Sequence, residues 1–280
     1  MEPSLHIIKT TVPLGIGHAV RFLHITDTHI ALDDPGKETD RYTCFDHDFP
    51  GCSQTYFQMA CRYAADNRLP MLNTGDFFDF LSERNFAFAD THLRPTDTIY
   101  AAGNHDFCHC VGAAKEDYAY KWEQIRRSAP HLPNNLYFYS RLIDGVNFVT
   151  LDNSYYLMTD GQTELLRAEA ARGYPIVLGI HTPLFTEEQA DRVLANGNPC
   201  AYMVGAPQAY LDRYPADRRA QQTPDEATRR AMAYIESEPM IRLIVAGHIH
   251  LNSETTLPGG IPQITTDGSY TGCVREITLL

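Results

Sequence analysis

The stretch TIYAAGNHD, residues 98–106, joins a short apolar run to three polar residues of kinds that bind metal ions. The apolar run is typical of a buried strand, and the glycine that follows it gives the backbone freedom to turn. Asn104 then offers a carbonyl oxygen, His105 an imidazole and Asp106 a carboxylate. A strand that ends in such a turn favours an α/β fold with a functional site beyond the carboxyl end of the strand.

Four other segments have the same construction, a strand-like run followed by residues that can bind metals. They are Asp27-Thr28-His29, Gly75-Asp76, His181 in the sequence GIHTP, and Gly247-His248-Ile249-His250. Side chains two residues apart on an extended chain point the same way, so Asp27 and His29 can reach one ion together. His248 and His250 have the same relation. We expect all five segments to meet at one edge of the fold.

The residue types in these segments indicate which metals would bind. Histidine nitrogen combined with Asp and Asn oxygen suits Mn, Fe, Zn, Co or Ni better than calcium or a thiolate-bound metal. A lone Asp-x-His or Gly-Asp pair carries little weight, so the prediction depends on the ordered set. The set contains enough groups to hold two ions side by side, and such a pair promotes displacement at phosphorus.

Apolar runs and helical spacing alternate along the first half of the chain, which predicts α/β layering. Strands are expected at residues 21–26, 70–74, 98–102, 135–140, 146–151, 176–180, 243–246, 254–257, 261–266 and 274–279. Helices are expected at residues 53–67, near 80–92 and at 116–128. Asp144-Gly145 predicts a hairpin turn, and residues 196–223 look rich in loops. Without a repeat or an obvious linker, residues 1–280 are expected to form a single domain.

Composition and charge argue against several classes of protein. The chain has 280 residues, of which 44% are hydrophobic and 21% charged, the balance of an ordinary globular protein. Its formal net charge is −12, with no cluster of Lys and Arg, which argues against a long DNA or RNA partner. No apolar run approaches membrane-spanning length, and the N-terminus does not look like a secretory signal. Seven cysteines without framework spacing indicate free thiols, so we expect a cytoplasmic protein.

The ordered pattern Asp-x-His, Gly-Asp, Gly-Asn-His-Asp, His, Gly-His-x-His resembles the calcineurin-like metallophosphoesterase superfamily, over most of the chain. The resemblance implies an α/β fold, a four-layer α/β/β/α sandwich of two mixed sheets flanked by helices. It also implies two transition-metal ions, divalent or trivalent, with Asp76 bridging them. The first ion would be held by Asp27, His29, Asp76 and His250. The second would be held by Asp76, Asn104, His181 and His248.

The same resemblance assigns catalytic roles. A hydroxide that bridges the two ions would attack the phosphorus. His105 would stand beside the leaving-group oxygen and stabilise or protonate it, and Asp106 would orient the His105 ring. The purple acid phosphatase branch places a ligating Tyr shortly after its Asp, whereas this chain has Phe77 and Phe78 after Asp76. That branch is therefore disfavoured.

The motifs do not separate a phosphodiester, such as a cyclic nucleotide, from a phosphomonoester. Chain length and complete motifs resemble bacterial cyclic-nucleotide phosphodiesterases of the superfamily. Two alternatives are a non-catalytic scaffold of the same fold and a nuclease. The intact ligand set and His105 disfavour the scaffold, and the acidic balance disfavours the nuclease. The sequence leaves the oligomeric state open.

A few residues outside the motifs are weaker candidates for the site. The connection of residues 31–52 is long for a loop without secondary structure, so it is either a solvated surface loop or a wall of the substrate pocket. Within it, Arg41 and His47 are candidate contacts for a phosphate ester. Elsewhere, His24 lies in the first expected strand and is predicted to be a core residue. Three tyrosines are candidates to stack on a base if the substrate is a nucleotide: Tyr155, Tyr156 and Tyr270.

Overall fold

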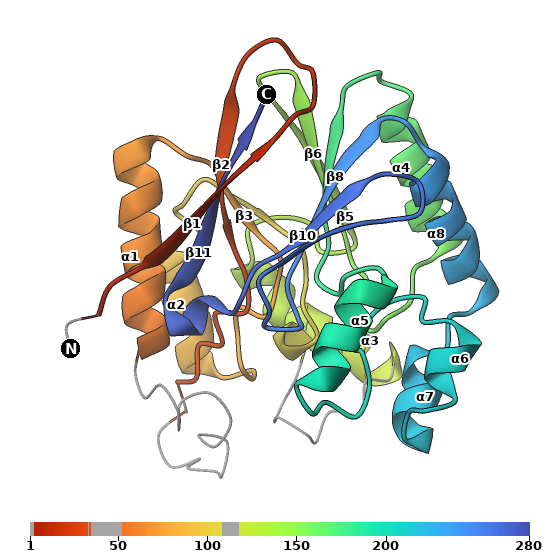
Figure 1. Ribbon diagram of the computed structural model, residues 1–280. Helices are drawn as coiled ribbons and strands as arrows, with labels where there is room; N and C mark the ends of the chain where they lie inside the picture. Colours follow the sequence, from red (N-terminus) through yellow and green to blue (C-terminus); the bar gives the residue numbers. More distant parts are fainter. Residues whose placement is uncertain (1–2, 33, 35–51, 108–117) are drawn as a thin grey trace.

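Two mixed β-sheets pack face to face in the computed structural model, which describes residues 3–32, 34, 52–107 and 118–280 (Figure 1). The first sheet has the strand order β1-β11-β2-β3-β4. Its strands are β1 (His6–Val12), β2 (Val20–Ile25), β3 (Met71–Asn73), β4 (Thr98–Tyr100) and β11 (Cys273–Leu279). The second sheet has the order β5-β6-β7-β8-β10-β9. Its strands are β5 (Phe138–Ile143), β6 (Val146–Leu151), β7 (Ile176–Gly179), β8 (Ile241–Ala246), β9 (Ser253–Thr256) and β10 (Pro262–Thr265).

Helices cover the outer face of each sheet (Figure 1). On the side of the first sheet lie α1 (Cys52–Asn67), α2 (Glu83–His92) and α3 (Tyr118–Ser128). On the side of the second sheet lie α4 (Asp160–Ala170) and α8 (Glu226–Ser237). Three further α-helices are α5 (Glu187–Ala195), α6 (Gln208–Leu211) and α7 (Ala216–Gln222). Single 3₁₀ turns are η2 (His105–Phe107), η3 (Ala129–His131) and η4 (Ser269–Thr271).

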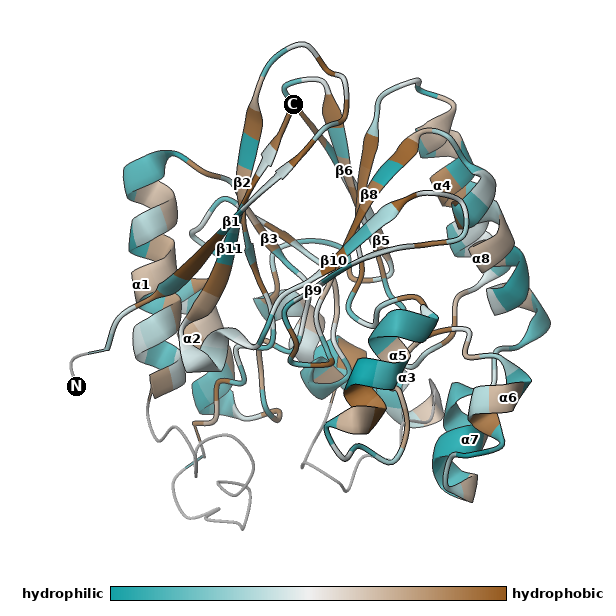
Figure 2. Ribbon diagram, viewed as in Figure 1, coloured by the Kyte–Doolittle hydropathy of each residue, from teal (hydrophilic) through white to brown (hydrophobic). Residues whose placement is uncertain are grey.

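One apolar core lies between the two sheets. Phe22 of β2 and Phe148 of β6 meet edge to face, with ring centroids 5.1 Å apart, and both are buried. Separate apolar clusters lie between each sheet and its helices, one containing Phe57 of α1 and the other Ile235 of α8. Figure 2 shows the hydrophobic colour concentrated on the central strands and bands of hydrophilic colour on the outer helices. This arrangement confirms the predicted four-layer α/β/β/α sandwich.

Most of the predicted elements match the structure within a few residues. The turn at Asp144-Gly145 is confirmed, because both residues have positive φ angles, 45° and 78°, and the turn joins antiparallel β5 and β6. Strand β1 was not predicted; it is an edge strand that pairs in parallel with β11 from the other end of the chain. Residues 196–223 were expected only to be rich in loops, whereas short helices α6 and α7 lie there, each preceded by a proline.

Strand direction decides where the candidate site lies. Strands β2, β3 and β4 are mutually parallel, and so are β6, β7, β8 and β10. The five predicted ligand segments follow β2, β3, β4, β7 and β8, so they all leave the sheets from carboxyl ends. In the described part of the chain, no helix combines the length and apolar character needed to cross a bilayer.

Candidate metal centre

The turns after β2, β3 and β8 hold several residues in the left-handed region of backbone space. The φ angles lie between 46° and 67° at Asp27, His29, Asp76, His248 and His250. Such a conformation costs about 1–3 kcal/mol per residue and persists only where the surrounding structure holds it. These are five of the seven predicted ligands, so backbone strain gathers where the sequence places the site.

Two turns approach each other so closely that only glycine fits between them. A Cβ atom on Gly103 would lie 2.1 Å from Oδ1 of Asp76, and one on Gly75 would lie 2.4 Å from the Gly103 nitrogen. Gly75 also has a φ of 98°, as its predicted turn requires. The two glycines therefore bring the ends of β3 and β4 into contact and place Asp76 beside Asn104.

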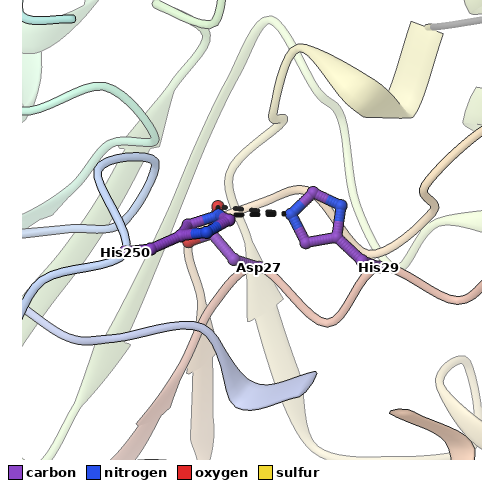
Figure 3. A group of neighbouring side chains, drawn as sticks. All are labelled: Asp27, His29 and His250. Carbon is purple, nitrogen blue, oxygen red and sulfur yellow. Dashed lines mark hydrogen bonds and ion pairs between the residues drawn. The ribbon is translucent and has the colours of Figure 1, made fainter. Parts of the chain in front are cut away.

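Asp27, His29 and His250 form the first cluster of candidate ligands (Figure 3). Nε2 of His250 lies 3.1 Å from Oδ1 of Asp27, and Nε2 of His29 lies 3.8 Å from the same oxygen. The two Nε2 atoms are 3.3 Å apart. Donor atoms from the ends of β2 and β8 therefore converge on one small volume.

Asp76, His181 and His248 form the second cluster, with Asn104 beside them. Nε2 of His181 lies 3.3 Å from Oδ2 of Asp76, 3.0 Å from Oδ1 of Asn104 and 3.0 Å from Nδ1 of His248. The same Asp76 oxygen lies 3.9 Å from Nε2 of His29. The Asp76 carboxylate thus stands between the two clusters, in the position of a shared ligand.

The hydrogen bonding of His181 shows why the second cluster suits a cation. Its Nδ1 lies 2.7 Å from the carbonyl oxygen of Thr74, and because a carbonyl only accepts, Nδ1 carries the hydrogen. In the neutral ring, Nε2 then presents a lone pair to the oxygens of Asp76 and Asn104. Burial alone would lower the pKa of this imidazole, but the Asp76 and Asp27 carboxylates and the Thr74 carbonyl together raise the pKa to about 9. Electron-rich atoms therefore meet where a proton or a metal ion must supply positive charge.

Buried carboxylates around the site also require positive charge nearby. Asp27, Asp76 and Asp79 are all buried, and in the described part of the chain their ion pairs are with histidines. Burial would raise the pKa of Asp76, yet His181 holds it well below its usual range. An ionised carboxylate is costly to bury without a compensating charge. The donor set and its charge thus fit two bound cations.

His105 is held by a different carboxylate from the one the sequence predicted. Its Nδ1 lies 2.9 Å from the carbonyl oxygen of Asp79 and 3.2 Å from Oδ1 of Asp79. The prediction that Asp106 orients this ring is wrong. The buried Asp106 carboxylate instead accepts hydrogen bonds from the Tyr100 hydroxyl and from the backbone N–H groups of Asp76, Phe77, Phe78 and Gly103. Asp106 therefore ties the turns after β3 and β4 together.

Two predicted substrate contacts, Arg41 and His47, lie outside the described residues, as does most of the 31–52 loop. The prediction that His24 is a core residue is confirmed. It is fully buried between two hydroxyl groups, with Nδ1 2.8 Å from Oγ1 of Thr266 and Nε2 2.8 Å from Oγ1 of Thr74.

Several residues around the site had no assigned role in the sequence analysis. Asp79 is the clearest, and its signal was its place in the sequence GDFFD, three residues after Asp76. Asn153 accepts hydrogen bonds from the backbone N–H groups of His181 and Thr182, which fixes the turn after β7. The expectation that Tyr155 and Tyr156 stack on a base is wrong, because both rings are buried.

Together, the four-layer sandwich and this set of donors define a protein of the metallophosphoesterase type. The family described as calcineurin-like phosphoesterase matches residues 20–252, which is most of the chain. The chain therefore belongs to this family, whose members are metal-dependent phosphoesterases with a dinuclear metal centre.

Solved structures with the same fold have little sequence in common with this chain. A dimetal phosphatase from Danio rerio has 13% identity and a TM-score of 0.52, over 90% of this chain and 88% of that one. A purple acid phosphatase from seeds of yellow lupin (Lupinus luteus) has 13% identity and a TM-score of 0.51, over 93% of this chain and 44% of that one. At this identity the likeness shows the fold alone. No curated protein sequence matches the chain.

Proposed function

We propose that the protein is a phosphohydrolase that uses two metal ions to cleave a small phosphate ester. One observation carries the proposal: Nε2 of His181 faces the oxygens of Asp76 and Asn104 at 3.3 and 3.0 Å. Such an arrangement is unfavourable unless a proton or a metal ion supplies positive charge between these atoms. A second donor cluster lies on the other side of the same Asp76 carboxylate.

The two clusters support the ligand sets that the family resemblance implies. The first ion would be held by Asp27, His29, Asp76 and His250, and the second by Asp76, Asn104, His181 and His248. These imidazole, carboxylate and amide donors suit Mn, Fe, Zn, Co or Ni. When bound, the two ions would lower the pKa of a water molecule and offset the negative charge that develops around phosphorus.

His105 is proposed to serve the leaving group. Because the carbonyl oxygen of Asp79 accepts from Nδ1, Nε2 is the ring nitrogen that can carry a proton to a departing oxygen. His105 is partly exposed, as a residue that meets substrate must be, whereas Asp79 is fully buried behind it. Asp79 would orient the ring and favour its protonated form.

The proposed substrate is small. A phosphodiester such as a cyclic nucleotide, or a phosphomonoester, suits a chain with a net charge of −12 better than a long nucleic acid does. The cytoplasmic location stays a prediction; the described cysteines Cys52, Cys61, Cys200 and Cys273 are free thiols, as a reducing compartment allows.

A substrate panel on metal-stripped and metal-supplemented protein tests the proposal. Aryl phosphate monoesters, aryl phosphate diesters, cyclic nucleotides and dinucleotides would each be assayed with Mn²⁺, Zn²⁺, Co²⁺, Ni²⁺ and Fe²⁺. We expect turnover of at least one ester class that disappears with chelation and returns with metal. Tight metal binding without turnover of any ester would instead indicate a scaffold. Turnover that survives complete removal of metal would contradict the proposal.

A further inference from the structure

The two histidines of the sequence His248-Ile249-His250 present different ring nitrogens to the candidate metal centre. His248 turns Nδ1 inward, 3.0 Å from Nε2 of His181. His250 turns Nε2 inward, 3.1 Å from Oδ1 of Asp27. The outward nitrogens are therefore Nε2 of His248 and Nδ1 of His250. Two neighbouring ligands thus need opposite tautomers if each is to offer a lone pair to an ion.

A tyrosine hydroxyl lies against each outward nitrogen. The Tyr156 hydroxyl is 3.0 Å from Nε2 of His248, and the Tyr270 hydroxyl is 3.3 Å from Nδ1 of His250. Tyr156 follows β6 and Tyr270 lies in η4, so unrelated parts of the chain supply the two hydroxyls. Each tyrosine thus lies on the side of its histidine that faces away from the metal cluster.

Tyr156 is held firmly in its place. The residue is 1% exposed, and its ring meets that of His248 edge to face, with centroids 5.5 Å apart. Its φ angle is 65°, a conformation that an aromatic residue seldom adopts. The backbone N–H of Tyr156 donates to the carbonyl oxygen of Asn153, whose side chain fixes the turn that carries His181. The strained backbone therefore aims the hydroxyl at His248 from within the frame of the second cluster.

Tyr270 has the corresponding relation to the first cluster. Its ring lies 5.3 Å from the ring of His250 and 5.8 Å from that of His29. Its backbone N–H donates to the carbonyl oxygen of Asp27. Tyr270 is thus in contact with all three members of the first cluster, as Tyr156 is tied to the second.

The hydroxyls can decide which ring nitrogen carries the hydrogen. A hydroxyl oxygen that accepts from the outward N–H leaves the inward nitrogen with its lone pair, the form that binds metal. We propose that Tyr156 and Tyr270 are positioning residues, each of which fixes the tautomer and ring orientation of one of these two histidines. Tyr156 thereby strengthens the second metal position and Tyr270 the first. The inference rests on the proposed metal centre.

The test is a pair of conservative substitutions, Tyr156→Phe and Tyr270→Phe, which remove the hydroxyls and keep the rings. Metal-stripped proteins would be dialysed against a series of free Mn²⁺ concentrations, with bound metal measured by atomic absorption. Loss of an outer partner of a metal-binding histidine weakens metal binding by about 10- to 100-fold. The free Mn²⁺ concentration would be one that just saturates the unsubstituted protein, which should then bind about two ions. At this concentration each single variant should bind about one ion, and the double variant almost none.

Variants that retain only one metal position show which position each tyrosine supports. His29→Ala should disable the first position and retain the second, and His181→Ala should disable the second and retain the first. Tyr156→Phe should weaken Mn²⁺ binding about tenfold or more in the His29→Ala protein and leave the Mn²⁺ affinity of the His181→Ala protein unchanged. Tyr270→Phe should weaken binding in the His181→Ala protein and leave the affinity of the His29→Ala protein unchanged. Tyr155→Phe is the matched control, because the buried Tyr155 ring packs near Phe107, 6.2 Å away, and beside the Lys121 ammonium.

The outcomes separate this inference from the proposed function. If the unsubstituted protein binds no Mn²⁺, the proposed metal centre itself fails. If the two single variants and the double variant bind about two ions with the same affinity as the unsubstituted protein, the metal centre stands and only the positioning roles are refuted. Equal weakening of both positions by either tyrosine, with unchanged thermal unfolding of the metal-free proteins, would also refute the site-specific assignment.

Discussion

Oδ1 of Asp79 lies 3.2 Å from Nδ1 of His105, and the carbonyl oxygen of Asp79 lies 2.9 Å from the same nitrogen. One buried residue thus contacts the proposed leaving-group acid with both its side chain and its backbone. The same carboxylate oxygen lies 3.0 Å from Nδ1 of His29, a candidate metal ligand. Asp79 therefore links the proposed proton donor to the first metal position.

Replacing His105 tests the proton-transfer role directly. His105→Ala should lower kcat by about 100-fold or more, the usual contribution of general acid–base catalysis. The variant should retain its metal, because His105 is not among the proposed ligands. Steady-state kinetics and metal analysis on the same sample check both parts. Unchanged kcat would refute the role, and loss of both ions would show that His105 serves the metals instead.

Replacing Asp79 and Asp106 distinguishes two carboxylates with different functions. Asp79→Asn should lower kcat by about 10-fold or more, because the amide cannot provide the negative charge that favours protonated His105. Asp106→Asn should instead lower the free energy of unfolding by about 2 kcal/mol or more, since an amide NH₂ would face backbone N–H donors. Kinetics and urea unfolding of both variants provide the measurement. Equal effects on kcat would revive the role first predicted for Asp106.

Asp76 stands between the two clusters, so its substitution should affect both. Asp76→Asn should weaken binding at both metal positions, whereas His181→Ala should weaken mainly the second and His250→Ala mainly the first. Mn²⁺ titration of the three metal-stripped variants makes the comparison. If Asp76→Asn spares either position, Asp76 is not a shared ligand.

His24 makes the stability of the protein depend on pH. Burial lowers its pKa from the usual 6.5 to about 3, so the unfolded chain takes up a proton that the folded protein excludes. This contribution to stability is complete above the unfolded pKa of 6.5 and declines as the pH falls toward 3. Between about pH 7.5 and pH 5.0 this decline lowers the free energy of unfolding by about 2 kcal/mol.

The matched variant is His24→Gln, which can still bond to Thr74 and Thr266 but does not titrate. Urea unfolding with chelator present, at both pH values, should show a pH dependence smaller by that amount in the variant. An identical pH dependence in the two proteins would mean that His24 is not excluded from protonation.

Local sequence predicted the parts of the structure that depend on neighbouring residues. Apolar runs marked the central strands, and each ended at a turn such as the one before Asn104, so the ligand segments could be placed at carboxyl ends. The edge strand β1 was missed because its partner, β11, lies at the other end of the sequence. A half-exposed strand such as β1 also lacks a continuous apolar run.

The contacts behind the candidate ligands could not be predicted in the same way. Asp106 is adjacent to His105 in sequence, but the 3₁₀ turn of η2 directs its carboxylate to the backbone of the β3 turn. Asp79 reaches His105 because Gly75 and Gly103 let the β3 and β4 turns touch. Tyr156 and Tyr270 reach their histidines only through the packing of distant segments, which no local pattern records.

The most direct test of the two-metal account is X-ray anomalous scattering from crystals of the protein soaked in Mn²⁺. The account predicts two neighbouring peaks on either side of the Asp76 carboxylate, one beside His29 and His250 and the other beside His181 and His248. Saturating Mn²⁺ without anomalous peaks at these residues, or with peaks only elsewhere on the protein, would contradict it.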